Sequence, residues 1–350
     1  MLKIDFYESG DGETIILTFP NGGMGIVDAH PSSFPGRPNI LELIRGRTLH
    51  FVCLTHPHRD HGADLVPILE NHPEIQAFWH TVSDVAVVAF TQQEAMNYPN
   101  YPGPSREAVV RLKKGWAEFV YDLYGAIAEK KIRWHQLRSD LRTETIDGVN
   151  ITVLSPDEAI KDRFVKAYRK RLEKFNAELP DANLLSAVLA LEYSGTVVLL
   201  GADALKENWR SATRLYFERE LPKAMVFKVP HHGASNALQV NPARHEHNYL
   251  DICSCQPPAK SVLFAGDAKH PDPDLFRRLR ARTDVTCISN GLRDGSRRAN
   301  PLNIHIPGAR AVSLPPVCNM VVSFSIDADG TLCQTAGTCT KECSAVRAAA

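Results

Sequence analysis

Residues 51 to 64 read Phe51-Val52-Cys53-Leu54-Thr55-His56-Pro57-His58-Arg59-Asp60-His61-Gly62-Ala63-Asp64. The first four form an apolar run that fits a buried β-strand, and this run ends abruptly in histidines and a carboxylate. Alternate side chains of an extended backbone point the same way, so we expect His56, His58 and Asp60 on one side. Imidazole nitrogen and carboxylate oxygen are ligands that zinc, iron and manganese accept. The segment therefore predicts a metal site rather than a histidine-rich surface loop.

The order His-x-His-x-Asp-His, present as His56, His58, Asp60 and His61, resembles the motif that hydrolases of the metallo-β-lactamase superfamily carry after a strand. The resemblance implies an α/β fold, the four-layer αββα metallo-β-lactamase sandwich, in which two sheets pack face to face with helices outside. It also implies that His56 and His58 bind one metal ion, while Asp60 and His61 help to bind another. Asp60 outside direct coordination could instead accept the proton of a metal-bound water.

The composition excludes few classes of function. The chain has 350 residues, of which 44% are hydrophobic, and its 40 basic and 40 acidic residues give zero formal charge. No global field therefore attracts nucleic acid or a membrane, and such contact would need a local patch. The first residues lack the apolar core of a signal peptide, and the longest apolar run, 184–205, is interrupted by polar residues. We expect a cytoplasmic protein without membrane contact and with reduced cysteines, although Cys333, Cys339 and Cys343 leave a zinc site in the tail as an alternative.

The N-terminal segment reads as two strands joined by a turn at Gly10-Asp11-Gly12, followed by a third strand that ends at Asp28. The superfamily opens in the same way. Asp28 could orient a metal-bound histidine from behind, or it could cap a turn at the end of its strand. His30 follows in a loop, and we interpret it as a bystander.

Three later apolar segments also end in candidate ligands. They lead into Gly201-Ala202-Asp203, into His231-His232-Gly233, and into His270-Pro271. The resemblance makes Asp203 the carboxylate that bridges two metal ions. Adjacent residues of an extended strand face opposite sides, so one of the two histidines should bind metal. We assign His231 to the metal and His232 to the substrate or a neighbour, and the reverse assignment stays open.

Four segments in the second half of the chain make the family resemblance more specific. Asn183-Leu184-Leu185-Ser186, Gly201 with Asp203, the segment Val229 to Gly233, and His270-Pro271 occur in that order. Together they resemble the metallo-hydrolase domain of ComEC-type DNA-uptake proteins and their soluble relatives, over most of residues 1–290. Two departures are the inserted Ala202, where that family has Gly-Asp, and Ala234 before Ser235. The separate third histidine of the lactamases and of glyoxalase II is not evident, which leaves its place to Asn183 or to water.

The expected organisation is a single domain over residues 1–350. A helical cap insertion at about 83–148 is indicated by prolines followed by apolar residues at helical spacing over 105–132. Such a cap could shape access to the site. A C-terminal extension at about 291–350 contains cysteines and a β-hairpin around Asp329-Gly330.

A basic helix and a basic loop could contact an anionic substrate. Ser155-Pro156-Asp157-Glu158 has the form of a capping box with Ser155 as the N-cap, and the helix should run to about residue 179. One face of this helix carries Lys161, Arg163, Lys166, Arg169, Lys170, Arg171 and Lys174. The loop carries Arg293, Arg297 and Arg298. The ordinary interpretation of such a face is solvated surface, and the alternative is contact with phosphate.

The candidate set is suited to two divalent metal ions, with zinc expected first and manganese or iron as alternatives. Its metal ligands are His56, His58, Asp60, His61, Asp203, His231 and His270, and its catalytic candidates are Asp60 and His232. Two such ions can lower the pKa of a shared water from its bulk value to about 7, which supplies hydroxide at neutral pH. By the resemblance, the chain is a phosphodiesterase or nuclease that acts on nucleic acid or nucleotides. The alternatives are a hydrolase of a small thioester, lactone or amide, and a non-catalytic metal-binding module.

Overall fold

The computed structural model describes residues 1–9, 12–31, 39–81, 123, 126–173, 181–238, 248–264, 270–288 and 321–336. The first sheet contains β1 (Leu2–Tyr7), β2 (Thr14–Thr18), β3 (Met24–Val27), β4 (Leu49–Leu54), β5 (Ala77–His80), β6 (Arg133–Gln136), β14 (Val321–Ile326) and β15 (Leu332–Ala336). The second contains β7 (Glu144–Ile146), β8 (Val149–Ser155), β9 (Val188–Tyr193), β10 (Thr196–Leu200), β11 (Ala224–Lys228), β12 (Ala259–Phe264) and β13 (Thr283–Ile288). The α-helices are α1 (Ile40–Leu43), α2 (Arg59–Gly62), α3 (Leu65–Asn71), α6 (Glu158–Glu173), α7 (Lys206–Glu218) and α8 (Pro273–Arg280). The 3₁₀ turns are η2 (Ala182–Leu185), η3 (Pro230–Gly233), η4 (Ser235–Ala237) and η5 (Tyr249–Asp251).

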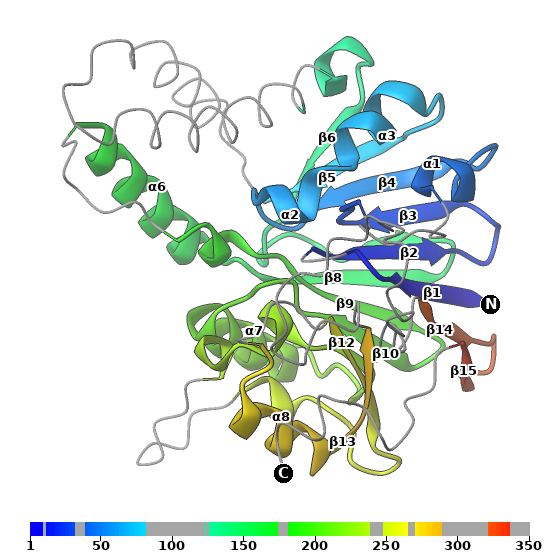
Figure 1. The fold of residues 1–350 in the computed structure, drawn as a ribbon, viewed down its shortest axis with the longest axis vertical. Coiled ribbons are helices and arrows are strands. Elements are labelled where there is room, and N and C mark those ends of the chain that lie inside the picture. The colour runs from blue at the N-terminus through cyan, green and yellow to red at the C-terminus, as the bar shows by residue number, and fades with distance from the viewer. Residues whose placement is uncertain are drawn as a thin grey trace, which may run out of the picture.

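Helices cover the outer faces of two sheets that pack face to face. The strand order is β15-β14-β1-β2-β3-β4-β5-β6 in the first sheet and β13-β12-β11-β10-β9-β8-β7 in the second. Apolar side chains from both sheets, such as Phe6, Trp79 and Leu200, form one core between them. Helices α1 and α3 pack on the far side of the first sheet, and α7 and α8 on the far side of the second (Figure 1). The predicted four-layer αββα sandwich is confirmed.

The central strands are apolar along their whole length because both of their faces are covered. In β4, Phe51 and Cys53 face the core between the sheets, whereas Val52 and Leu54 pack under the outer helices. Strand β10 divides its side chains between the same two kinds of core. Such strands read as unbroken apolar runs, which is why the sequence reveals them clearly.

Parallel pairing brings the candidate ligand segments to one edge. In the first sheet, β3, β4, β5 and β6 pair in parallel, each with the next. In the second sheet, β10, β11, β12 and β13 do the same. Ligands commonly bind outside the carboxyl ends of such strands, and the loops after β4, β10, β11 and β12 all lie there. The two sheets meet at this edge, because the backbone N–H of Ala187 donates to the carbonyl of Thr55 at 2.9 Å.

Strands occupy the last part of the segment predicted as a helical cap insertion at about 83–148. Strand β6 forms the edge of the first sheet and β7 the edge of the second. The predicted boundary at 148 is therefore too late, since the sheets resume at Arg133. The side chains of β6 are exposed or half-buried, so β6 lacks the apolar alternation that would reveal a strand. Most of the predicted cap lies outside the described residues, but Leu123 and Ile127 pack with α3.

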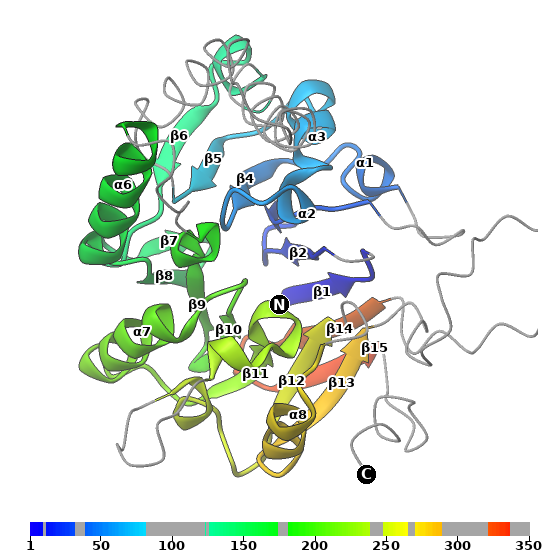
Figure 2. The ribbon, with the colours of Figure 1, turned by 60° about the vertical axis from the view of Figure 1, so that its left-hand side comes forward.

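The hairpin predicted around Asp329-Gly330 is confirmed as β14 and β15, but it belongs to the first sheet. Strand β14 pairs with β1 from Leu2 opposite Ile326 to Tyr7 opposite Val321 (Figure 2). This hairpin is therefore an integral part of the domain, which corrects its description as part of an extension. Pairing between opposite ends of the chain leaves no local signal. Cys339, Cys343 and the loop with Arg293, Arg297 and Arg298 lie outside the described residues.

Two helices differ from expectation. Helix α6 begins at Glu158, and its N-cap is Asp157, whose side chain accepts from the backbone N–H of Ile160 at 2.8 Å. Ser155, the predicted N-cap, instead ends β8 and accepts from Asn208 Nδ2 at 2.8 Å. Helix α7 has no counterpart among the predicted elements.

Among the described residues no helix has the length and apolar character needed to cross a bilayer. The described cysteines, which are Cys53, Cys253, Cys255, Cys287 and Cys333, are free thiols. Cys333 is exposed.

Candidate metal centre

Three imidazoles from two separate segments surround one carboxylate oxygen. Asp203 follows β10 in a tight turn in which Ala202 has a positive φ of 42°. Its Oδ2 lies 3.4 Å from Nε2 of His61, 4.0 Å from Nε2 of His56 and 4.0 Å from Nε2 of His231. The Asp203 side chain is buried. Segments that are far apart in sequence thus converge on one buried oxygen atom.

The histidine loop reaches this oxygen through a turn, and not through the extended backbone from which its side-chain directions were predicted. Residues 59–62 form the helical turn α2, and the N–H of His61 donates to the carbonyl of His58 at 3.2 Å. His56 Nε2 lies 3.0 Å from His58 Nδ1, and Asp60 Oδ2 lies 3.9 Å from His61 Nε2. The structure therefore gathers all four motif residues by curling the chain around the site.

Asp28 orients His61 from behind, which is the first of its two predicted alternatives. Its Oδ2 lies 2.7 Å from Nδ1 of His61 and accepts from Thr55 Oγ1 at 2.6 Å, while its Oδ1 accepts from Thr55 N at 2.8 Å. With the Nδ1 proton held by Asp28, the Nε2 atom of His61 is directed at Asp203. A carboxylate behind a histidine in this way fixes its tautomer for metal binding.

The adjacent histidines of η3 both approach the centre. Their φ angles are 48° for His231 and 53° for His232, so this backbone is left-handed and not extended. The two rings therefore do not point to opposite sides, and that prediction is wrong. His231 is partly exposed near Asp203, with its Nδ1 3.0 Å from Asn236 Oδ1. His232 is buried, and its Nδ1 lies 3.3 Å from the carbonyl of Phe264.

His270 lies beside His231, with 6.1 Å between the ring centroids. Its loop packs on η3, because the N–H of Asp272 donates to the carbonyl of Gly233 at 2.9 Å. Gly233 has a φ of 77°, and a Cβ there would lie 2.6 Å from Pro271 Cβ. The glycine thus allows the two histidine-bearing loops to touch.

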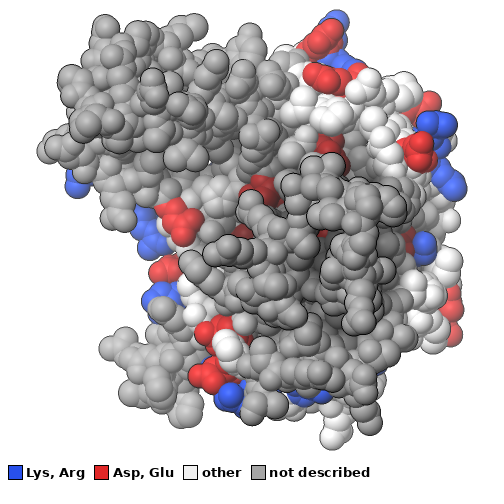
Figure 3. Space-filling model, in the orientation of Figure 1, with Lys and Arg blue, Asp and Glu red and all other residues white. Residues whose placement is uncertain are grey.

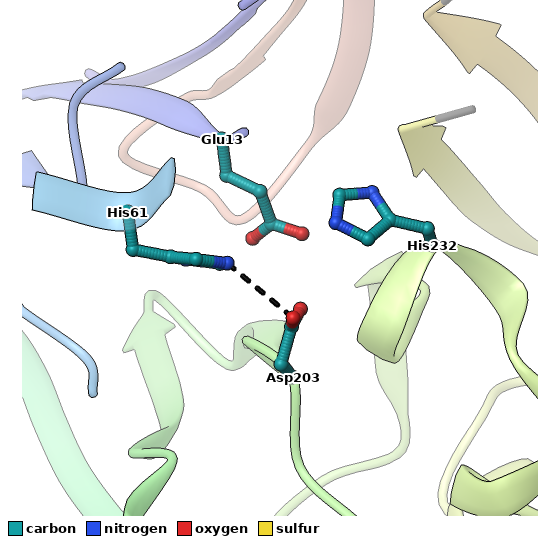
Figure 4. Close-up of side chains that lie close together, drawn as sticks. All are labelled: Glu13, His61, Asp203 and His232. Carbon is teal, nitrogen blue, oxygen red and sulfur yellow. Dashed lines mark ion pairs between the residues drawn. The ribbon is translucent and has the colours of Figure 1, made fainter. Parts of the chain in front are cut away.

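A tighter cluster of buried donors contains a residue that the motif analysis missed. Glu13, His61, Asp203 and His232 each present a ligand atom, and these atoms all lie within 4.8 Å of one another (Figure 4). Glu13 precedes β2 and enters from the first sheet, opposite Asp203. Of the predicted metal ligands, this cluster contains His61 and Asp203, and it adds His232 in place of His231.

Close packing delivers Glu13 to this position. A Cβ on Gly12 would overlap the backbone oxygen of Asp60 and the His30 side chain, so only glycine lets the β1–β2 loop lie against the histidine turn. His30 joins the same loops, with its Nδ1 2.8 Å from the carbonyl of Ser9. His30 therefore holds the loop in place, in keeping with its interpretation as a bystander.

A buried cation, Lys228, is the second residue that was missed. It ends β11 with its side chain fully buried, forms an ion pair with Glu13, and lies 3.9 Å from Asp203 Oδ1. Its Nζ also donates to the carbonyl of Ala202 at 2.7 Å. A lysine inside the apolar segment 224–230 was a visible signal, because lysine is almost never fully buried unless it is paired.

Burial and charges within the centre shift the pKa values of His56 and His61 in opposite directions. Burial, reinforced by the neighbouring rings of His61 and His58, holds the pKa of His56 well below its usual range. Burial alone would also lower the pKa of His61, but the carboxylates of Asp203 and Asp28 raise it well above the usual range. Burial opposes ionisation of Asp203, yet His61, His232 and Lys228 hold its pKa well below the usual range.

These residues fit a divalent metal ion. His61 Nε2 and Asp203 Oδ1 are buried and lack a hydrogen-bond partner among the described residues, although buried polar atoms are almost always satisfied. Imidazole nitrogens and carboxylate oxygens are the donors that zinc, manganese and iron accept. A divalent cation beside His61 would satisfy its Nε2 atom, and Asp203 Oδ1 lies 3.9 Å from Lys228 Nζ.

Two further polar side chains, those of Asn183 and His80, are buried. Asn183 is buried in η2, and its Oδ1 has no hydrogen-bond partner among the described residues. Its role in place of a third histidine stays a prediction. His80, at the end of β5, packs against Trp134 with 3.7 Å between ring centroids, and burial holds its pKa well below the usual range. This aromatic packing agrees with a structural histidine.

No protein-family model and no curated protein matches this chain. Among solved structures, a mutant of the CmlA β-hydroxylase is similar with a TM-score of 0.46 and 12% identity over 81% of this chain, which spans about half (52%) of that protein. Igni18, a metallo hydrolase from the archaeon Ignicoccus hospitalis, has a TM-score of 0.41 and 11% identity over 82% of this chain and 95% of its own. A diphosphatase of the PhnP family has a TM-score of 0.38 and 10% identity over 81% of this chain and 94% of its own. All three scores are below 0.5, so the function must be argued from the site itself.

Proposed function

We propose that this protein is a metal-dependent hydrolase with two divalent ions, zinc first, at the Asp203 centre. The observation that carries the proposal is the approach of three imidazole Nε2 atoms to a single buried oxygen, Asp203 Oδ2, within 4.0 Å. His56 and His58 would hold one ion, and His61 with Asp60 would hold the other. His231 and His270 complete the rim of the same site.

The chain's own residues set up the reaction in distinct ways. Bound ions would supply hydroxide by lowering the pKa of a shared water to about 7. Asp28 keeps the Nδ1 proton of His61 away from the ligand position, and the Phe264 carbonyl does the same for buried His232. His231, the more accessible of the pair, is placed to hydrogen-bond a substrate oxygen.

We propose a phosphodiester as the substrate bond, in a nucleotide or a nucleic acid. Support comes from the exposed basic residues Arg163, Lys166 and Lys170 of α6, which could contact phosphate. Lys161 does not belong to that surface, because it is buried. On the face drawn in Figure 3, described acidic and basic residues are interspersed, so any contact with phosphate is local.

The test is metal analysis of purified protein followed by a substrate panel. Bis-p-nitrophenyl phosphate, single-stranded DNA, cyclic nucleotides and a lactone are incubated with protein loaded with zinc, manganese or iron. Loss of a residue behind a metal ligand typically lowers metal affinity or activity about 10- to 100-fold. Asp203→Asn removes the shared ligand itself, so the hydrolysis rate should fall by about 100-fold or more. The exposed Asp140→Asn is the matched control. Equal rates for wild type and Asp203→Asn on every substrate would refute the hydrolase, and lactone turnover alone would refute the phosphodiesterase.

A further inference from the structure

The ion pair between Glu13 and Lys228 has no assigned role in the metal centre. We propose that Glu13 is the counter-ion of Lys228 and not a metal ligand. The pair then keeps the local charge balanced while the metal ions bind on the histidine side. This inference rests on the metal centre of the proposed function and concerns how that centre acquires its ions.

The geometry divides the two oxygens of Asp203 between two kinds of partner. Oδ2 faces the imidazoles of His56, His61 and His231, whereas Oδ1 faces Lys228 at 3.9 Å. The Lys228 ammonium therefore lies on the Oδ1 side, and a metal ion held by Oδ2 and the histidines would not contact it.

A backbone carbonyl also fixes the position of Lys228. The oxygen of Ala202 accepts from Lys228 Nζ at 2.7 Å and from the backbone N–H of His231 at 2.9 Å. Ala202 has a φ of 42°, a conformation that a non-glycine residue rarely adopts unless its surroundings impose it. This carbonyl therefore holds the Lys228 ammonium beside the turns that carry Asp203 and His231.

Glu13 makes this buried cation tolerable. A lysine with no exposed surface is strongly unfavourable without a paired charge. Glu13 reaches it from the first sheet, so the pair links the two sheets at the metal edge. Its net charge is zero whichever partner holds the proton, and the cation-attracting charge of the centre therefore comes from Asp203 and Asp60.

The proximity of Glu13 to His61, Asp203 and His232 also allows the opposite assignment, in which Glu13 is itself a ligand. The two assignments predict different behaviour when both partners are removed. Removing both members of a charge-balancing pair should leave the metal affinity unchanged, whereas removing a ligand lowers it. A double-variant cycle therefore separates them.

The experiment measures zinc and manganese binding to metal-depleted protein, by competition with a chromogenic chelator and by metal content per chain. Four proteins are compared: wild type, Glu13→Gln, Lys228→Met and the double variant. Glu13→Gln leaves an unbalanced ammonium beside the site and should weaken metal binding about 10- to 100-fold. Lys228→Met should strengthen binding, because Glu13 then adds negative charge. The double variant should return to the wild-type affinity.

Two results would overturn the inference. A double variant as weak as Glu13→Gln would make Glu13 a ligand, and an unchanged affinity in Glu13→Gln would leave the pair without influence. If a single variant does not fold, the double variant buries no unpaired charge and carries the test by direct comparison with wild type. Lys228→Arg, which keeps the cation, should retain metal affinity.

The outcome is separable from that of the proposed function, because binding is measured without substrate. A wild type that binds metal but hydrolyses no substrate refutes the hydrolase and leaves the pair intact. A wild type that hydrolyses, with a weak double variant, refutes only the pair. A wild type that binds no divalent ion refutes both.

Discussion

Single residues behind the ligands decide how each imidazole is presented. Asp28, one residue beyond β3, uses both oxygens to hold Thr55 and His61. Its φ of 55° lies in the left-handed region, which asparagine and aspartate tolerate better than most residues. A replacement that keeps this backbone but changes the hydrogen bond to His61 is therefore available.

We expect Asp28→Asn to lower metal affinity about 10- to 100-fold, as is typical when the group behind a ligand histidine is lost. The amide keeps an acceptor for Thr55 but no longer stabilises the Nδ1 proton of His61. Isothermal titration of metal-depleted protein with zinc measures the effect, and the exposed Asp140→Asn serves as control. Unchanged affinity would show that His61 needs no orienting carboxylate.

At the scale of elements, short left-handed turns position the site more than the strands do. In η3, His231, His232 and Gly233 all have positive φ. Such backbone is uncommon for non-glycine residues and concentrates at functional sites. The turn is held by contact with the His270 loop, and Gly233 is the point where the two touch.

Gly233→Ala should lower the free energy of unfolding by about 1–3 kcal/mol through overlap with Pro271, beyond the strain of its positive φ. Gly46→Ala is the matched control, because Gly46 has a φ of 69° but nothing within 4 Å of its added Cβ. Urea unfolding of both variants isolates the overlap. Equal destabilisation would contradict packing between the two loops, and only Gly233→Ala should also weaken metal binding.

At the scale of the whole molecule, charged side chains from the two sheets come together only because the sheets pack against each other. The first sheet supplies Glu13, Asp28 and the histidine loop, while the second supplies Asp203 and Lys228. In metal-free protein a protonated His61 sits between two carboxylates. Its raised pKa therefore links global stability to pH.

Metal-free protein should lose stability as the pH rises above about 6.5, the ordinary histidine pKa, towards the raised pKa of His61. A group whose folded pKa is raised contributes fully below its unfolded pKa and loses that contribution as pH rises through the folded pKa. The lowered pKa of His56 makes stability depend on pH only below the ordinary histidine pKa. Thermal unfolding at several pH values in a chelator measures the slope, and His61→Asn should flatten it. A stability that rises over this range would contradict the assignment.

The sequence by itself determined the central strands and the positions of most donors. Apolar runs buried on both faces end abruptly in His56, Asp203 and His231, and both facts are local. A parallel arrangement of such strands gathers their carboxyl ends, so convergence at one edge follows from the pattern.

Only the tertiary structure decided which donors face inward and what stands behind them. Glu13 and Lys228 meet because the two sheets pack together, and no spacing along the chain encodes that contact. Both η3 histidines approach Asp203 because the backbone is left-handed there, whereas an extended strand would have separated them. The physical reason is the same in each case: these contacts depend on close approach between distant segments, and local periodicity describes only each segment by itself.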